Sequence, residues 1–306
     1  MRILFAGTPT NAASTLDALV SAGFQVVGVL TRNDAKVGRN KSITETPVAV
    51  VAAKHGIEVQ KANFISPYVQ SWIEDKNADL GVIVAYGSIL KNPTLQLPAK
   101  GWINVHYSLL PEFPGAAPVQ HAILEGKSVT GVSVFRLDEG IDTGPILASR
   151  EHEIAPNVTA GELLSELTVI GSVLLVETVS FLDERIANQR QQPKQPSPRV
   201  AGKLSRTDAK IDFSRPVISV HNLIRAMNPE PMAWFEIEKS PVRVLSTSLS
   251  QHSDLTPGEL MVREGDLLIG CEGGALKLSR VQPAGKNEMS GADWFRGLRQ
   301  DSIRIS

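Results

Sequence analysis

The sequence of 306 residues contains a single cysteine, Cys271, and few aromatic residues. One cysteine excludes an intramolecular disulfide framework and every zinc or iron–sulfur site that needs several thiolates, and it fits a reducing compartment. The six histidines are scattered, and even the two nearest in sequence, His106 and His121, lie too far apart to be metal ligands on one helix face. We therefore expect an activity that needs no metal ion.

The chain also has little net charge and no long hydrophobic run. Lys plus Arg total 31 and Asp plus Glu total 32, so whole-chain charge gives no reason to expect a polyanionic or anionic-membrane partner, and only a local basic patch could attract one. The longest apolar candidate, residues 171–182, is interrupted by polar side chains and is shorter than the roughly 18 residues of a membrane span. The apolar stretch before Thr8 is too short for a secretion signal. We expect a cytoplasmic protein without membrane contact.

The first half of the sequence alternates short apolar runs with segments of helical spacing. This alternation is typical of βαβ units, and it predicts an α/β domain with a mostly parallel sheet covered by helices on both faces. Continuous apolar runs predict strands that are buried on both sides. The expected strands are residues 2–6, 26–30, 58–60, 80–85, 102–106, 132–137 and 146–153, and the expected helices are residues 11–22, 47–54, 67–75 and 159–187.

The second half begins with a proline-rich segment and then changes pattern. A chain of this length suggests two domains of about 150 residues each, and we predict a first domain over 1–187, a basic linker over 188–206 and a second domain over 207–306. The second domain shows five short alternating runs separated by turn residues, which predicts a small antiparallel β-barrel of oligonucleotide-binding type. Residues 185–206 contain six basic residues and no acidic one; a solvated linker and an anion-binding segment are both compatible with this.

Three polar residues form a candidate site at strand ends. Asn104 and His106 are two positions apart on an expected strand, so their side chains point to the same face. Asp142 lies in a glycine-flanked loop after the next strand, and such loops are where open α/β sheets bind ligands. An amide and an imidazole can stabilise an oxyanion, and a carboxylate can orient the imidazole, so the set suits acyl transfer. A core histidine with ordinary strand-end and turn residues remains the alternative.

No nucleophile accompanies these residues. Cys271 belongs to the other domain, and Ser108 lacks the G-x-S-x-G context of a serine nucleophile. Direct attack by an acceptor on a bound acyl donor is therefore favoured over an acyl-enzyme. A nucleotide cofactor is disfavoured, because the first turn, residues 5–9, is not a G-x-G-x-x-G and contains a proline.

Several segments together resemble the formyltransferases that use 10-formyltetrahydrofolate. The resemblance rests on Asn104–Pro111 (NVHYSLLP), Gly115–Gln120, Thr130–Val132 and Leu137–Gly144. Within that superfamily the chain is most similar to the methionyl-tRNA formyltransferase family, because this similarity runs over nearly the whole sequence. It includes residues 5–9 (FAGTP), 84–87 (VAYG), 228–234 (NPEPMAW) and 282–286 (QPAGK).

The resemblance implies a Rossmann-like catalytic domain joined by a linker to a barrel that helps to hold tRNA. It also implies that 10-formyltetrahydrofolate is the formyl donor and that the amino group of methionyl initiator tRNA attacks its formyl carbon. Asn104 and His106 would stabilise the tetrahedral oxyanion, and Asp142 would position His106 and help to move a proton to the departing folate nitrogen. The implied folate-binding residues are Ser108, Leu109, Leu110 and Pro111 and the pterin-pocket residues Val84, Ala85, Tyr86 and Gly87.

The same resemblance suggests where tRNA would be bound. Residues 34–43 resemble the family's flexible basic loop, and the linker is basic; the candidate tRNA-binding residues are Lys36, Arg39, Lys41, Arg190, Lys194, Arg199 and Lys203. Two features depart from the pattern. Glu112-Phe113-Pro114 stands where tRNA-acting members usually carry two arginines, and residues 207–306 contain 12 basic and 13 acidic residues. We therefore expect weak or salt-sensitive binding of tRNA.

Three hypotheses remain open at this point. The leading one is a tRNA-acting formyltransferase that functions as a monomer. A second keeps the folate chemistry but uses an amino sugar, another small amine or water as acceptor, and Glu112 and the nearly neutral barrel are its best support. The third, a non-catalytic RNA-binding protein on the same scaffold, is disfavoured because Asn104, His106 and Asp142 are all present.

Overall fold

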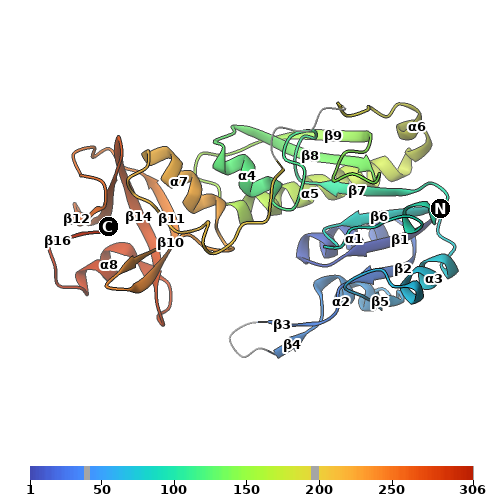
Figure 1. Ribbon diagram of the computed structural model, residues 1–306, viewed down its shortest axis with the longest axis horizontal. Helices are drawn as coiled ribbons and strands as arrows, with labels where there is room; N and C mark the ends of the chain where they lie inside the picture. Colours follow the sequence, from blue (N-terminus) through green and yellow to red (C-terminus); the bar gives the residue numbers. More distant parts are fainter. Residues whose placement is uncertain (38–41, 194–199, 306) are drawn as a thin grey trace. The chain divides into compact units, whose positions relative to one another are not determined.

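The computed structural model describes residues 1–37, 42–193 and 200–305, and these divide into two compact units (Figure 1). The first comprises Met1–Gly115, Thr130–His152 and Leu164–Val200. The second comprises Ala116–Val129, Glu153–Leu163 and Ala201–Ser306, so it takes two segments from the part of the chain that precedes the linker. The domain boundaries expected from the sequence, after residues 187 and 206, remain predictions.

A seven-stranded sheet forms the centre of the first unit (Figure 1). Its order is β5-β2-β1-β6-β7-β8-β9; neighbours from β5 to β7 are parallel, and β8 is antiparallel to β7. This confirms the predicted mostly parallel α/β sheet. The strands are β1 (Arg2–Gly7), β2 (Gln25–Thr31), β5 (Val59–Lys61), β6 (Leu80–Val84), β7 (Trp102–His106), β8 (Val129–Arg136) and β9 (Ile146–Glu153).

Helices cover both faces of this sheet. On one face α1 and α5 are joined by a hydrogen bond of 3.1 Å between the hydroxyls of Thr15 and Ser172. On the other face Trp72 of α3 packs in a cluster with Leu4 and Trp102. The helices of this part of the chain are α1 (Thr10–Ser21), α2 (Pro47–Lys54), α3 (Pro67–Asp75), α5 (Ala160–Ser180), α6 (Leu182–Ala187) and the short 3-10 turn Thr94–Gln96.

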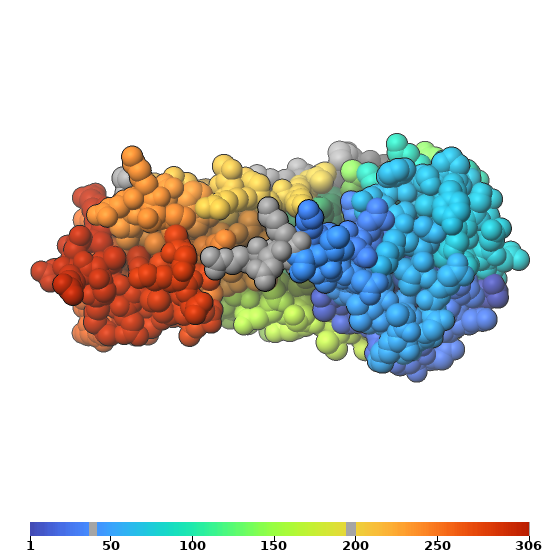
Figure 2. Space-filling model, turned by 90° about the horizontal axis from the view of Figure 1, so that it is seen from below, coloured from blue at the N-terminus to red at the C-terminus, as the bar shows by residue number. Residues whose placement is uncertain are grey.

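Local sequence explains where two of these helices begin. The Thr46 hydroxyl accepts a hydrogen bond from the Ala49 amide at the start of α2, and the Ser66 hydroxyl accepts one from the Val69 amide at the start of α3. In both helices a proline follows the capping residue, where its missing N–H and fixed φ are favourable. Figure 2 views the molecule from the side on which α2 and α3 form the surface of their unit.

The predicted helix over 159–187 is instead two helices. It is interrupted at Phe181, whose backbone is not helical (φ −118°, ψ 32°). Within the described ranges α5 is the one helix long and apolar enough to cross a membrane, with a mean hydropathy of 1.6, but half of its apolar window is buried inside the protein. A core helix has the same properties, so this is weak evidence for a membrane span.

The second unit contains a curled antiparallel sheet, which confirms the predicted barrel-like domain. Its order is β10-β11-β14-β13-β12-β16, and β15 pairs with β14. The sequence predicted five of these strands and missed the two short ones, β15 and β16. The elements are β10 (Trp234–Ile237), β11 (Ser240–Leu249), β12 (Glu259–Arg263), β13 (Asp266–Cys271), β14 (Gly274–Pro283), β15 (Met289–Ser290), β16 (Ser302–Arg304), α4 (Pro118–Leu124), α7 (Val217–Ala226) and α8 (Gly291–Arg296).

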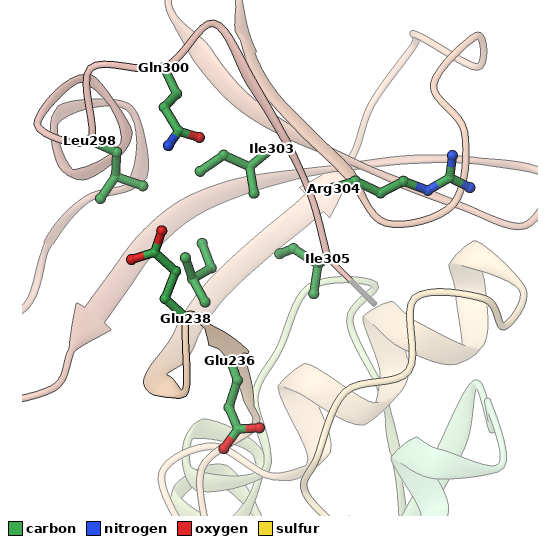
Figure 3. Close-up of a pocket in the computed structure, with 8 residues that line it drawn as sticks. Glu236, Glu238, Leu298, Gln300, Ile303, Arg304 and Ile305 are labelled. Atoms are coloured by element: carbon green, nitrogen blue, oxygen red, sulfur yellow. The ribbon is translucent and has the colours of Figure 1, made fainter.

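A pocket of about 320 Å³ lies between the two edge strands of this sheet, β10 and β16 (Figure 3). Glu238 and Ile303 point into it, whereas the Arg304 side chain points away. In the part of the chain that the structure describes, no strand pairing joins β10 to β16. The sheet is therefore a partly open barrel, as in oligonucleotide-binding folds.

Buried polar side chains of α7 hold the segment 153–158 within the second unit. Arg225 Nη1 donates to the carbonyl oxygens of Ala155 and Val158, each at 3.3 Å. His221 Nε2 donates to the carbonyl oxygen of Pro156 at 3.2 Å. Both side chains are less than a tenth exposed, and these contacts satisfy groups that would otherwise be costly to bury. They explain why this segment belongs to the second unit.

Candidate active site

The order of the strands places a ligand-binding edge at the carboxyl ends of β1, β6 and β7. From β1 the chain proceeds to β2 and β5 on one side, and the later strands β6 and β7 lie on the other. In open α/β sheets the carboxyl ends of strands at such a reversal form the binding crevice. The predicted Asn104, His106 and residues 84–87 all lie at this edge.

His106 and Asp142 are brought together there. Their closest atoms, Nδ1 of His106 and Oδ2 of Asp142, are 3.5 Å apart, and their side chains are 6% and 15% exposed. The other ring nitrogen, Nε2, donates to the carbonyl oxygen of Phe113 at 2.9 Å. Since the Phe113 carbonyl can only accept, Nε2 carries a hydrogen, and Nδ1 is the ring nitrogen that faces the Asp142 carboxylate.

The segment after the predicted Ser-Leu-Leu-Pro turn holds both members of this pair through its backbone. Phe113 supplies the carbonyl that binds His106, and the Gly115 N–H donates to Oδ2 of Asp142 at 2.7 Å. Phe113 and Asp142 both have positive φ, 53° and 55°, a conformation that is uncommon outside glycine. Such conformations are concentrated at functional sites, where the surrounding structure enforces them.

Asn104 supplies an unsatisfied polar atom to the same site. It lies two residues before His106 on β7, so both side chains are on the same face of the sheet. Its side-chain oxygen is buried and has no hydrogen-bond partner among the described residues. Buried polar atoms are nearly always paired in native proteins, so this one indicates a place where a ligand completes the site.

The predicted turn 108–111 is fixed from below by Ser133 of β8, a residue that lies opposite His106 in the β7–β8 ladder. The Ser133 hydroxyl donates to the carbonyl oxygen of Ser108 at 2.8 Å and accepts from the Leu110 N–H at 3.0 Å. The Ser108 hydroxyl in turn donates to the carbonyl oxygen of Glu112 at 2.5 Å. The turn is therefore held by β8, which pairs with β7, the strand that carries Asn104 and His106.

Residues 84–87 form a second fixed loop at this edge. The Tyr86 side chain is buried, and its hydroxyl donates to the Ala62 carbonyl at 2.7 Å. Burial raises the pKa of Tyr86 to about 12, so this donor stays protonated at neutral pH. Thr8 donates to the carbonyl of Tyr86 and Arg32 to that of Gly87. The Tyr86 ring thus anchors the loop, and the backbone of the loop is what a ligand could contact.

Within the described ranges, neither a reactive cysteine nor a cluster of metal-binding side chains accompanies the site. Cys271 is buried in the second unit, and burial raises the pKa of its thiol to about 12, so it is not a thiolate at neutral pH. Among the residues that the structure describes, no group of three or more His, Cys, Asp and Glu side chains could hold a metal ion. A metal-free reaction remains an expectation.

Three of the seven predicted tRNA-binding residues lie within the described residues, and they belong to different units. Lys36 and Arg190 are exposed in the first unit, and Lys203 is exposed in the second. Arg39, Lys41, Lys194 and Arg199 lie outside the described residues.

Sequence reasoning missed three residues of the site, which are Ser133, Phe113 and Gln192. Phe113 and Ser133 act through the contacts given above. Gln192 donates its side-chain amide to the backbone of the loop that carries Asp142. In the sequence, the glycines of the Asp142 loop and the apolar run of β8 indicate close packing here, but neither signal identifies a hydrogen-bond partner.

Comparisons with known proteins cover both units. The formyl transferase family model matches residues 1–179, and the model of the formyl transferase C-terminal domain matches residues 203–299. A methionyl-tRNA formyltransferase of Paenarthrobacter aurescens (strain TC1) is 43% identical over 299 residues, 97% of each chain. One of Clavibacter michiganensis subsp. michiganensis (strain NCPPB 382) is 42% identical over 304 residues, 99% of each chain.

Solved structures share the fold at lower identity. A sugar 3N-formyl transferase, WlaRD, crystallised in the presence of dTDP and 5-N-formyl-THF, has a TM-score of 0.68 at 20% identity, covering 94% of this chain and 99% of that one. An N-formyltransferase from Helicobacter canadensis in complex with folinic acid and dTDP-3-aminofucose has a TM-score of 0.66 at 21% identity, covering 92% and 98%. At these identities the likeness concerns the fold alone.

Proposed function

Because the chain belongs to the formyl transferase family, with matches to its N-terminal and C-terminal models, we propose that it is a methionyl-tRNA formyltransferase. The matches confirm the resemblance to the formyltransferases that the sequence motifs indicated. In this reaction the formyl group of 10-formyltetrahydrofolate passes to the amino group of methionyl initiator tRNA. The acceptor is inferred from relatives of that name with about 40% identity over nearly the full length of both chains.

The observation that carries the chemistry is the pairing of His106 with Asp142 beside the unsatisfied Asn104 oxygen. The Asn104 amide can donate an N–H to the oxyanion that develops when an amine attacks the formyl carbon, and its oxygen can accept an N–H of that amine. His106 adds stabilisation of the oxyanion. Since Nε2 now donates to Phe113, its use for this purpose requires the ring to exchange that acceptor for the substrate.

Asp142 positions His106 and helps to move the proton that the reaction must transfer. The attacking nitrogen forms a bond to the formyl carbon, the bond from that carbon to the folate nitrogen breaks, and one proton passes from the amine to the departing nitrogen. The separation of 3.5 Å between Oδ2 and Nδ1 is longer than a hydrogen bond, and such contacts commonly tighten when substrate binds.

The residues at the sheet edge fit a folate. Bound there, 10-formyltetrahydrofolate supplies the formyl carbon, and no nucleophile of the protein is needed. Val84, Ala85, Tyr86 and Gly87 offer a fixed backbone to the pterin ring, and Ser108, Leu109, Leu110 and Pro111 form the second fixed segment of the proposed folate site. The orphan Asn104 oxygen is the observation that supports this fit.

Binding of tRNA is assigned to basic residues of the segment 34–43, whose described ends form the short strands β3 (Ala35–Val37) and β4 (Ser42–Thr44), and to basic residues of the linker. These residues are Lys36, Arg39, Lys41, Arg190, Lys194, Arg199 and Lys203. They would contact phosphates, so binding should weaken steeply with salt. The proposed enzyme acts in the cytoplasm, without metal, as a monomer with 1–187 as its catalytic domain, 188–206 as its linker and 207–306 as its barrel domain.

A small amine or water as acceptor is favoured by one observation. Glu112 places an exposed carboxylate next to Phe113, whose carbonyl binds His106, and negative charge there opposes an approaching phosphate backbone. This second candidate keeps the same folate chemistry and changes only the acceptor.

The test follows formyl transfer from 10-formyltetrahydrofolate to charged methionyl initiator tRNA, to uncharged tRNA with free methionine, or to buffer alone. Formylation confined to the charged tRNA supports the proposal, whereas folate turnover without it supports the second candidate. His106→Ala and Asn104→Ala should each lower kcat by at least about 100-fold, as loss of an oxyanion donor does. Full activity in either variant would contradict the assigned site.

A further inference from the structure

One side chain ties the Asp142 loop to the first residues of the linker. The amide nitrogen Nε2 of Gln192 donates to the carbonyl oxygens of both Asp142, at 2.8 Å, and Gly144, at 2.7 Å. The Gln192 side chain is half-buried. A single amide group thus uses its two hydrogens to hold the two carbonyls on either side of Thr143, and an amide is the neutral side-chain group with this donor geometry.

The loop is already constrained from within and from below. Oδ1 of Asp138 accepts from the Gly140 N–H at 3.0 Å and from the Thr143 hydroxyl at 2.7 Å. A Cβ atom at Gly144 would lie 1.8 Å from the carbonyl oxygen of Arg136, so only glycine allows this approach to the end of β8. Gln192 supplies the restraint from outside, and its removal leaves the two carbonyls to solvent.

The position of the Asp142 main chain determines where its carboxylate lies. Its φ of 55° is uncommon outside glycine, and the hydrogen bonds around the loop hold the residue in this conformation. The carboxylate oxygen Oδ2 accepts from the Gly115 N–H at 2.7 Å and lies 3.5 Å from Nδ1 of His106. Since misplacing a reacting group by about 1 Å can cost about 100-fold in rate, small shifts of this loop should be visible in kcat.

The segment that carries Gln192 is itself anchored in the first unit. Arg190 and Ile146 exchange two backbone hydrogen bonds, of 2.9 and 2.8 Å, at the start of β9. Gln192 follows two residues later, so its backbone is held beside the strand that continues the Asp142 loop. The start of the linker therefore acts as a support for the loop.

We propose that Gln192 is a positioning residue for Asp142, which makes the start of the linker part of the support of the active site. Gln192 does not touch the reacting atoms; it fixes the loop from which the Asp142 carboxylate reaches His106. The proposal rests on the proposed function, because it assigns Gln192 a role in that reaction.

Two substitutions separate a hydrogen-bonding role from simple packing. Gln192→Ala removes the donors and the volume, and we expect a kcat about tenfold lower with both KM values within about twofold of wild type. Gln192→Glu keeps the volume but places a carboxylate against two carbonyl oxygens, so its kcat should be lower still. Gln191→Ala is the matched control, since Gln191 is the exposed neighbour, and it should match the wild-type protein.

Each outcome decides between the two roles. If Gln192→Glu keeps more activity than Gln192→Ala, the side chain acts by filling space and the proposal is wrong. Equal kcat for Gln192→Ala and Gln191→Ala also overturns it. A wild-type protein that formylates no methionyl-tRNA refutes the proposed function instead. In that case amide hydrogen exchange of residues 138–145 decides the present proposal: Gln192→Ala should accelerate it relative to Gln191→Ala, and unchanged exchange would refute it.

Discussion

Replacement of Ser133 by alanine tests whether the turn 108–111 depends on β8, the strand that carries Ser133. The Ser133 hydroxyl is fully buried and serves two backbone groups, the carbonyl of Ser108 and the N–H of Leu110. Ser108 is also fully buried, and Leu110 is 2% exposed. Water therefore cannot replace the lost hydroxyl without opening the structure, and both backbone groups lose their partner at once.

The magnitude follows from the number of groups left unsatisfied. A buried donor or acceptor without a partner costs about 1–3 kcal/mol, so two of them cost about 2–6 kcal/mol. Removal of one oxygen atom adds little cavity cost, and we expect a loss in the lower half of the range, about 3 kcal/mol in the free energy of unfolding. At about 2–4 °C for each kcal/mol in a domain of this size, the melting temperature of the first unit should fall by roughly 6–12 °C.

The assay compares thermal unfolding of this variant with that of Ser180→Ala. Ser180 also donates its hydroxyl to a backbone carbonyl, that of Val176, but on the exposed side of α5. Its loss should change stability by no more than about 0.5 kcal/mol. Melting temperatures that differ by less than about 1 °C between the two variants would show that Ser133 does not support the turn. A raised KM for 10-formyltetrahydrofolate should accompany the lower stability, because the turn is a proposed folate contact.

Two further predictions concern other anchors. Tyr86→Phe removes the hydrogen bond to the Ala62 carbonyl, so the free energy of unfolding should fall by about 1–2 kcal/mol. The KM for the folate should rise severalfold, with kcat little changed. An unchanged KM in steady-state kinetics would argue against a folate contact by this loop. His221 is buried with Nδ1 accepting from Thr247 and Nε2 donating to Pro156, and burial, helped by the nearby Arg225, lowers its pKa from the ordinary 6.5. Because the folded-state pKa is depressed, the unfolded chain takes up the proton first, and stability should be retained above pH 6.5 and decline as pH falls below it. His221→Gln should flatten this pH dependence in thermal melts, and an equally steep decline in the variant would contradict the assignment.

Patterns in the amino-acid sequence are enough to specify the two kinds of sheet and the chemical character of the site. Continuous apolar runs separated by helical spacing specify buried parallel strands, and alternation specifies strands with one exposed face, because each pattern matches the surface that the strand must bury. Period two along a strand is also enough to place Asn104 and His106 on one face. The position of Asp142 in a glycine-flanked loop makes it a candidate, and the family resemblance supplied its role and the folate.

Contacts between segments that are distant in sequence fix which groups hold these residues. The carbonyl of Phe113, the N–H of Gly115 and the amide of Gln192 reach the His106–Asp142 pair across sequence separations that no local pattern encodes. Two of these contacts are made by backbone atoms, which are identical in every residue and leave no trace in side-chain identity. The short strands β15 and β16 were missed for a related reason, since two or three residues show no periodicity and only pairing with β14 and β12 makes them strands.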